Sequence, residues 1–93
     1  MTNLTKEELE ELILDNQEYL YRLAFSYMKN DADAQDAVGE TIVVAYERIY
    51  TLRKKESARA WLMKILINQC LSLLRKHKRE SMITDYEEKY HKS

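Results

Sequence analysis

The chain has 93 residues, a single glycine, no proline and a formal net charge of −1, so it is long enough for one hydrophobic core. Because helix-breaking residues are almost absent, the composition predicts an all-α fold, a compact bundle of about four helices. The chain shows neither a secretory signal nor an apolar run of the roughly 18–20 residues that span a bilayer, so we expect no export and no membrane insertion.

Two short helices are predicted in the first third of the chain. Thr5 and Glu8 have the spacing of a capping box, so one helix begins there, and Asp15 or Asn16 ends it or caps the next. Apolar residues at steps of three and four predict a second helix over residues 17–29. The expected inward positions are Leu9, Leu12 and Ile13 in the first helix, and Leu20, Leu23, Ala24, Tyr27 and Met28 in the second.

A third, acidic helix is predicted to follow, with Asp31 as its N-cap. Asp33 and Asp36 suit the positive end of the helix dipole. The polar stretch of residues 51–56 then predicts a loop. The inward face of this helix is expected to carry Ala37, Val38, Ile42, Ala45 and Ile49.

The fourth helix is predicted to be the longest and most basic, running from about Ala58 to Arg79 with Ser57 as its N-cap. Its inward face is expected to carry Leu62, Ile65, Leu66, Gln69 and Leu73, with Cys70 as core filler. Because Cys70 has no partner for a disulfide within the chain, we expect a reducing compartment, the cytoplasm. Residues 1–79 are expected to form the domain, and the polar segment 80–93 a tail or interdomain linker.

The small net charge hides a strong asymmetry along the chain. Residues 1–50 carry eleven acids and four bases, whereas residues 53–79 carry nine bases and one acid. A basic block concentrated on one helix favours a polyanionic partner.

Enzymatic chemistry is not expected from these residues. The chain has no glycine-rich phosphate loop, and Cys70, His77 and His91 lack metal-ligand spacing. Neighbouring acids such as Glu10 and Glu11 point away from each other on a helix, so they make a poor acid and base pair. We therefore predict no catalytic residue, no metal and no cofactor.

Asp36, Glu40 and Glu47 recur at steps of four and seven, which aligns them along one side of the third helix. A solvated helix face is the ordinary interpretation of any one of these acids. As a row they could pair with bases on a partner helix, although exposed ion pairs contribute only about 0–1 kcal/mol each. A stable complex would also need the apolar contacts that Val43, Val44 and Tyr46 could supply.

Between Tyr50 and Arg79, basic residues alternate with aromatic rings and amides. Basic side chains attract phosphate, while rings and amides stack on or hydrogen-bond to exposed nucleobases. Trp61 is expected to pack rather than to stack, because Trp61 and Leu62 followed by Ile65 is the pattern of a core-facing turn. The basic run 75–79 could also be only a helix end matched to the dipole.

Two stretches carry recognisable motifs: QDAVGETI at residues 35–42, followed by Ala45 and Tyr46, and SARAWLMKILINQCLSLLRKHKR at residues 57–79. Both resemble region 2 of extracytoplasmic-function (ECF) sigma factors of the sigma-70 family, whose patterns are ED-x-x-Q-E-T-F-x-x-a-W and F-R-A-W-L-x-x-I-a-x-N-x-x-x-D-x-x-R. The resemblance covers about residues 17–79. The second pattern is matched by Arg59, Ala60, Trp61, Leu62, Ile65, Asn68 and Arg75.

The resemblance implies a promoter-specificity domain of bacterial RNA polymerase that recognises and melts the promoter −10 element in transcription initiation. In that family the acidic helix binds the clamp helices of the polymerase β′ subunit, the loop captures a flipped −10 base, and the basic helix follows the single-stranded non-template strand. The acid row and the resemblance together place polymerase binding on Asp36, Glu40, Thr41, Val44 and Glu47. DNA binding falls on Tyr50, Arg53, Lys54, Lys55 and Ser57 in the loop, and on Arg59, Lys64, Asn68, Arg75, Lys76 and Arg79 in the helix. The resemblance also adds an anti-sigma factor to the candidate partners.

Three positions depart from the family pattern: Gly39 replaces the usual glutamine, Ser72 the usual aspartate and Ala58 the usual aromatic residue. Gly39 is expected to cost about 0.5–1 kcal/mol of helix stability and to remove an amide from the polymerase interface. The helix-turn-helix domain that reads the −35 element in a full sigma factor of this class is not found in the chain. The alternative interpretation is a helical protein-interaction module or regulator with a sigma-like surface that does not read DNA. A double-stranded DNA reader ranks third, since no short helix-turn-helix with a glycine turn is visible.

Overall fold

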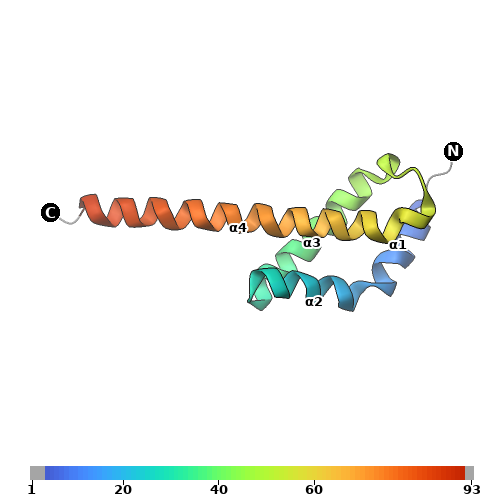
Figure 1. The fold of residues 1–93 in the computed structure, drawn as a ribbon, viewed down its shortest axis with the longest axis horizontal. Helices are drawn as coiled ribbons and strands as arrows, with labels where there is room; N and C mark the ends of the chain where they lie inside the picture. The colour runs from blue at the N-terminus through green and yellow to red at the C-terminus, as the bar shows by residue number, and fades with distance from the viewer. Residues whose placement is uncertain (1–3, 92–93) are drawn as a thin grey trace.

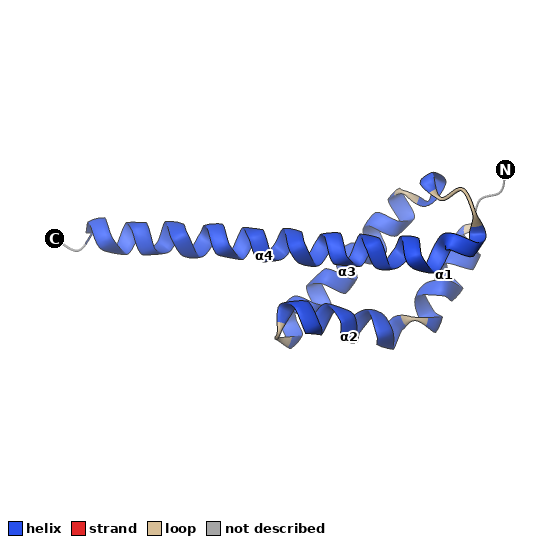
Figure 2. Ribbon diagram, in the orientation of Figure 1, coloured by secondary structure: helices blue, strands red, loops and turns tan. Residues whose placement is uncertain are grey.

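The computed structural model describes residues 4–91, and the side chains of residues 4–81. The helices are α1 (Lys6–Asp15), α2 (Gln17–Met28), α3 (Asp31–Glu47) and α4 (Ala58–His91), and two 3₁₀ turns, η1 (Ile49–Thr51) and η2 (Lys55–Ser57), join α3 to α4. Figure 1 shows α4 along the length of the molecule, with the other helices gathered at its N-terminal part. Only short connections separate the helices (Figure 2). The predicted all-α bundle of four helices, with a long and basic last helix, is confirmed.

The start of α1 and the end of α2 follow from local sequence. Glu8 N donates to Thr5 Oγ1 at 3.1 Å and Thr5 N donates to Glu8 Oε1 at 2.9 Å, so the predicted capping box is confirmed. Asn16 ends α1, as expected. At the end of α2, Lys29 adopts the left-handed conformation with φ of 65°, a position that glycine usually occupies.

The N-cap of α3 is Asn30, so the prediction of Asp31 is wrong by one residue. Asn30 has an extended backbone, and its Oδ1 accepts a hydrogen bond from Asp33 N at 2.9 Å. Asp31 is the first residue of the helix, and its carboxylate instead accepts from Tyr21 Oη. This hydrogen bond raises the pKa of the Tyr21 hydroxyl and ties α2 to the start of α3.

The predicted start of α4 at Ala58 is confirmed, but its predicted cap and its predicted end differ from the structure. Ser57, expected to cap the helix, is the last residue of η2, which leads directly into α4. The helix continues to His91, so the predicted end at Arg79 is wrong, whereas a tail or interdomain linker over residues 80–93 stays a prediction. Residues 80–91 contain no glycine or proline to stop the helix. Residues 92–93 lie outside the described part of the chain, and a domain boundary at residue 79 stays a prediction.

All four helices contribute to one hydrophobic core. The buried apolar side chains are Leu9 and Ile13 in α1, Leu20, Ala24 and Met28 in α2, Ala34, Ala37 and Ala45 in α3, and Leu62, Ile65, Leu66 and Cys70 in α4. The predicted inward faces of α1, α2 and α4 agree with this core, and Cys70 is core filler as expected. On α3 the predicted Ala37 and Ala45 are buried, and the predicted Val38 and Ile42 pack against the core partly buried, as does Ile49 in η1. The sequence missed Ala34 and Thr41, which are fully buried on the same helix. Such small residues let helix backbones approach closely.

Gly39 lies at an exposed position in the middle of α3 with an ordinary backbone, and a Cβ added there would meet nothing within 4 Å. We expect Gly39→Ala to raise the free energy of unfolding by about 0.5–1 kcal/mol, because alanine restricts the unfolded chain and favours the helix. Urea unfolding followed by circular dichroism measures the change. The reverse exchange at another exposed position of the same helix, Ala32→Gly, should lower the free energy of unfolding. A destabilised Gly39→Ala variant would contradict this account.

Candidate functional site

The acids predicted to bind polymerase lie on the outer face of α3. Asp36, Glu40 and Glu47 are all exposed. Val43, between Glu40 and Glu47 on the same side, is 51% exposed. We call these four residues the acidic stripe. It combines negative charge with one exposed apolar side chain, as a partly charged protein interface requires.

Two predicted members of this surface are turned inward. Thr41 is fully buried, and its hydroxyl donates to Ala37 O at 2.7 Å. Thr41 is therefore not part of the acidic stripe, and its role as a polymerase contact stays a prediction that its burial does not favour. Val44 is half-buried and packs against the core, so Val43 replaces it as the exposed valine.

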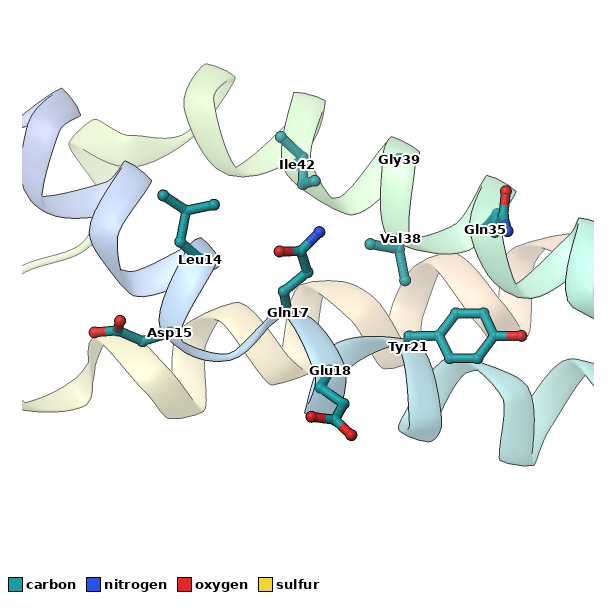
Figure 3. A pocket seen from close by; sticks show the side chains of 9 residues that line it. All are labelled: Leu14, Asp15, Gln17, Glu18, Tyr21, Gln35, Val38, Gly39 and Ile42. Carbon is teal, nitrogen blue, oxygen red and sulfur yellow. The ribbon is translucent and has the colours of Figure 1, made fainter.

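A groove of about 780 Å³ runs beside the acidic stripe, where the end of α1 and the start of α2 face α3 (Figure 3). Its lining residues are Leu14, Asp15, Gln17, Glu18, Tyr21, Gln35, Val38, Gly39 and Ile42. Leu14 is 59% exposed, and Val38 and Ile42 present apolar surface from α3. Gly39 lines this groove and also a neighbouring hollow that Asp36 and Glu40 line. The groove therefore adds apolar area and the carboxylates of Asp15 and Glu18 to the acidic side of the molecule.

A second hollow lies at the opposite end of α3, between the loop and the first turns of α4. It has a volume of about 400 Å³ and is lined by Thr51, Leu52, Arg53, Lys54, Ser57, Ala60, Trp61 and Lys64. We call it the loop hollow. Its lining surface is mostly apolar, and three basic side chains belong to it. This combination fits a flat, mostly apolar group attached to a phosphate chain.

Hydrogen bonds fix the two walls of the loop hollow against each other. Trp61 Nε1, from α4, donates to Thr51 Oγ1 at 3.2 Å, and Thr51 Oγ1 donates to Arg48 O at 2.7 Å. The Trp61 ring is half-buried and packs against the core, as expected. The part of the side chain that is not covered by the core lines the loop hollow. Tyr50, next to the hollow, is 74% exposed. Its ring is free to stack.

From the loop hollow, a row of polar and basic side chains continues along the outer face of α4. Lys64, Asn68, Arg75 and Arg79 are exposed and recur at steps of four, seven and four. We call them the basic stripe. It spans about 22 Å at 1.5 Å per residue. No acid occurs between residues 58 and 79, so the positive charge of this face is not offset along the helix.

Three other residues predicted to bind DNA lie away from this stripe. Lys55 Nζ pairs with Glu8 Oε2 of α1 at 3.0 Å, and Arg59 Nε donates to Asn16 Oδ1 at 2.8 Å. The capping hydrogen bond from Thr5 N and the contact with Lys55 lower the pKa of the Glu8 carboxyl. Lys76 lines a groove between α3 and α4, together with Asp36 and Glu40 of the acidic stripe. All three bases were predicted to contact DNA, and these contacts stay predictions; in the structure the three side chains lie apart from the basic stripe.

Some residues that line the loop hollow were not named individually as predicted contacts, although Thr51 and Leu52 belong to the loop that was predicted to capture a base. Thr51 and Leu52 line the loop hollow from the loop, and Ala60 and Trp61 line it from α4. For the α4 wall, the helical spacing of Ala60, Trp61 and Lys64 was the available signal, because these positions share one side of the helix. Lys78 was also missed: it frames a shallow hollow on α4 with Ser72, Arg75 and Arg79.

The described metal-ligating and nucleophilic side chains do not gather at one place. Across residues 4–81, whose side chains the structure describes, no three His, Cys, Asp or Glu side chains are grouped so that they could hold a metal ion. Cys70 is fully buried, and burial raises the pKa of its thiol, so it is a poor nucleophile. Within the same residues, no helix has the length and apolar character needed to cross a membrane.

Comparisons with known proteins match most of the chain. The Sigma-70 region 2 family matches residues 12–80. The RNA polymerase sigma factor SigV of Bacillus subtilis (strain 168) is 41% identical over 81 residues, which make up 87% of this chain and 49% of that protein. The chain therefore spans about half the length of this curated relative. No solved structure gives a significant match.

Proposed function

This chain belongs to the sigma-70 region 2 family, and from that premise we propose that it is a promoter-specificity domain of bacterial RNA polymerase. The resemblance to region 2 of ECF sigma factors is confirmed. In the proposed function the domain docks on polymerase and holds an unpaired promoter strand during transcription initiation in the cytoplasm. It acts by binding and performs no bond chemistry.

The acidic stripe and the groove beside it are proposed to bind the clamp helices of the β′ subunit. Asp36, Glu40 and Glu47 would pair with basic side chains of a partner helix. Exposed ion pairs are weak one by one, so the affinity must also come from apolar area. Val43 on the stripe and Leu14 in the groove provide that area, since both are more than half exposed.

The loop hollow and the basic stripe are proposed to hold the non-template strand of the −10 element. The observation that carries this proposal is their continuity: a mostly apolar hollow with Arg53, Lys54 and Lys64 in its lining leads into a row of exposed bases on the same helix. A flipped base would enter the hollow, and the phosphates would follow the stripe toward Arg79. Unstacking a base costs a few kcal/mol, which capture in the hollow and phosphate contacts would offset.

The proposed strand path predicts a change in salt dependence that separates two neighbouring residues of α4. Replacing Lys64 and Arg75 together by glutamine should lower the log–log salt slope of single-strand binding by about 1.4, since each lost phosphate contact removes about 0.7. Lys76→Gln should leave the slope unchanged, because Lys76 lies in the groove between α3 and α4. Fluorescence anisotropy with a labelled single strand at several salt concentrations measures both slopes.

Equal slopes for the wild type and the Lys64/Arg75 double variant would refute the proposed path. If the chain bound β′ clamp helices but no single strand at low salt, the alternative would hold: a helical interaction module with a sigma-like surface. An anti-sigma factor is a further proposed partner, on the ground of the family alone.

A further inference from the structure

The first turn of α4 is tied to the corner between α1 and α2 by one side chain, Arg59. Its Nε donates to Asn16 Oδ1 at 2.8 Å, and its guanidinium carbon lies 4.9 Å from the centre of the Tyr19 ring. Asn16 is itself fixed, because its Nδ2 donates to Leu12 O at 2.8 Å, which leaves Oδ1 free to accept from Arg59. A planar guanidinium that is hydrogen-bonded at its edge and stacked on a ring has a defined orientation.

Arg59 lies on a different side of α4 from the basic stripe. At 3.6 residues per turn it is about 140° around the helix from Lys64. Its neighbours Ser57, Ala60 and Trp61 line the loop hollow, whereas Arg59 does not. Holding Arg59 against the α1–α2 corner therefore sets the rotation of the helical turn that forms one wall of the hollow.

The opposite wall comes from the loop, through Thr51 and Leu52, and the loop has its own tie to α1. Lys55 Nζ and Glu8 Oε2 are 3.0 Å apart. Both partners are substantially exposed, so this ion pair by itself contributes little. The α1–α2 region thus contacts both segments whose separation defines the loop hollow.

We propose that Asn16 and Arg59 are positioning residues that hold the loop hollow in the shape that admits a base, and that Arg59 contacts no phosphate. This inference rests on the proposed function of the hollow. It extends the DNA-reading unit to the corner between α1 and α2, which lies outside the strand path. It also revises the role that the family resemblance implied for Arg59.

The test compares Arg59→Ala, Asn16→Ala, the double variant and Asn16→Asp in single-strand binding. We expect Arg59→Ala and Asn16→Ala each to lower the affinity about tenfold, and the double variant to lose no more than the larger single loss. The salt slope should stay at the wild-type value, whereas Lys64→Gln should lower it by about 0.7. Asn16→Asp loses the same bond to Leu12 O as Asn16→Ala but keeps an acceptor for Arg59, so it should bind like the wild type.

A second measurement reports the loop without DNA. Limited trypsin cleavage after Arg53, Lys54 and Lys55 should accelerate in Asn16→Ala and Arg59→Ala, but not in Asn16→Asp, at a temperature where circular dichroism shows all variants folded. Unchanged cleavage in Asn16→Ala would overturn the proposal, and so would a salt slope that falls by about 0.7 in Arg59→Ala, which would make Arg59 a phosphate contact. If the wild type bound no single strand, the proposed function would fail. The cleavage rates of the variants relative to the wild type would still show whether the contact between Arg59 and Asn16 holds the loop in place.

Discussion

Reversing the charge of Asp36 and Glu40 to lysine is expected to abolish binding to an isolated β′ clamp coiled coil, a loss of at least about 100-fold in affinity. In the proposed interface each reversal would replace an attractive pair by a like-charge contact, which costs several kcal/mol, and every 1.4 kcal/mol is a factor of ten. Both side chains are exposed on the outer face of α3, so the fold should survive the change. Isothermal titration calorimetry at low salt measures the affinity, and circular dichroism checks the helix content.

Glu10 and Glu11 provide a matched control for this experiment. They are exposed on α1, outside the acidic stripe and the groove beside it, and reversing both changes the net charge by the same amount. We expect the Glu10→Lys/Glu11→Lys variant to bind within a few-fold of the wild type, since distant exposed charges are screened by salt. Undiminished binding by the Asp36/Glu40 variant would remove the acidic stripe from the interface. An equal loss of affinity in the control would mean that the change in net charge, and not the position of Asp36 and Glu40, weakens binding.

Truncating Leu66 to alanine is expected to lower the free energy of unfolding by about 3–5 kcal/mol, through lost burial and the cavity left behind. Leu66 is fully buried in the middle of the core. A domain of this size has a total stability of only about 5–10 kcal/mol, so the variant should be partly unfolded at physiological temperature. Urea unfolding of both proteins gives the difference.

Leu71 is the matched control, because it lies on the same helix and is 39% exposed. Leu71→Ala has the same change in helix propensity but leaves a smaller gap, so it should cost less than about 1.5 kcal/mol. Equal costs for the two truncations would mean that α4 does not pack against the other helices as described.

Much of the fold could be predicted from the sequence because its signals are local. The capping box at Thr5 and Glu8 involves two residues one helical turn apart. The strongly apolar positions of α2 and α4, such as Leu20 and Leu62, define one face each. The inward face of α3 was harder to predict, because the alanine and threonine residues at its buried positions differ little in hydrophobicity from the residues beside them. The prediction therefore assigned the larger Val38 and Ile42 to the inward face and left out Thr41, which is fully buried.

The candidate site was only partly predictable, because charge type does not tell where a long side chain turns. Lys64, Arg75 and Arg79 lie on the outer side of α4, and helical spacing alone places them there. Lys55, Arg59 and Lys76 have the same chemistry, but Glu8, Asn16 and the α3 groove lie within reach of their flexible stems.

The sequence by itself determined the helical class, the segregation of acids and bases between α3 and α4, and the family motifs, since these depend on composition and on spacing within single helices. Only the tertiary structure decided which polar residues remain at the surface for a partner. It buried Thr41, joined Arg59 to Asn16 and formed the loop hollow between two segments. The physical reason is that helical periodicity fixes the faces of one helix, whereas burial, pairing and hollows depend on which helix packs beside it.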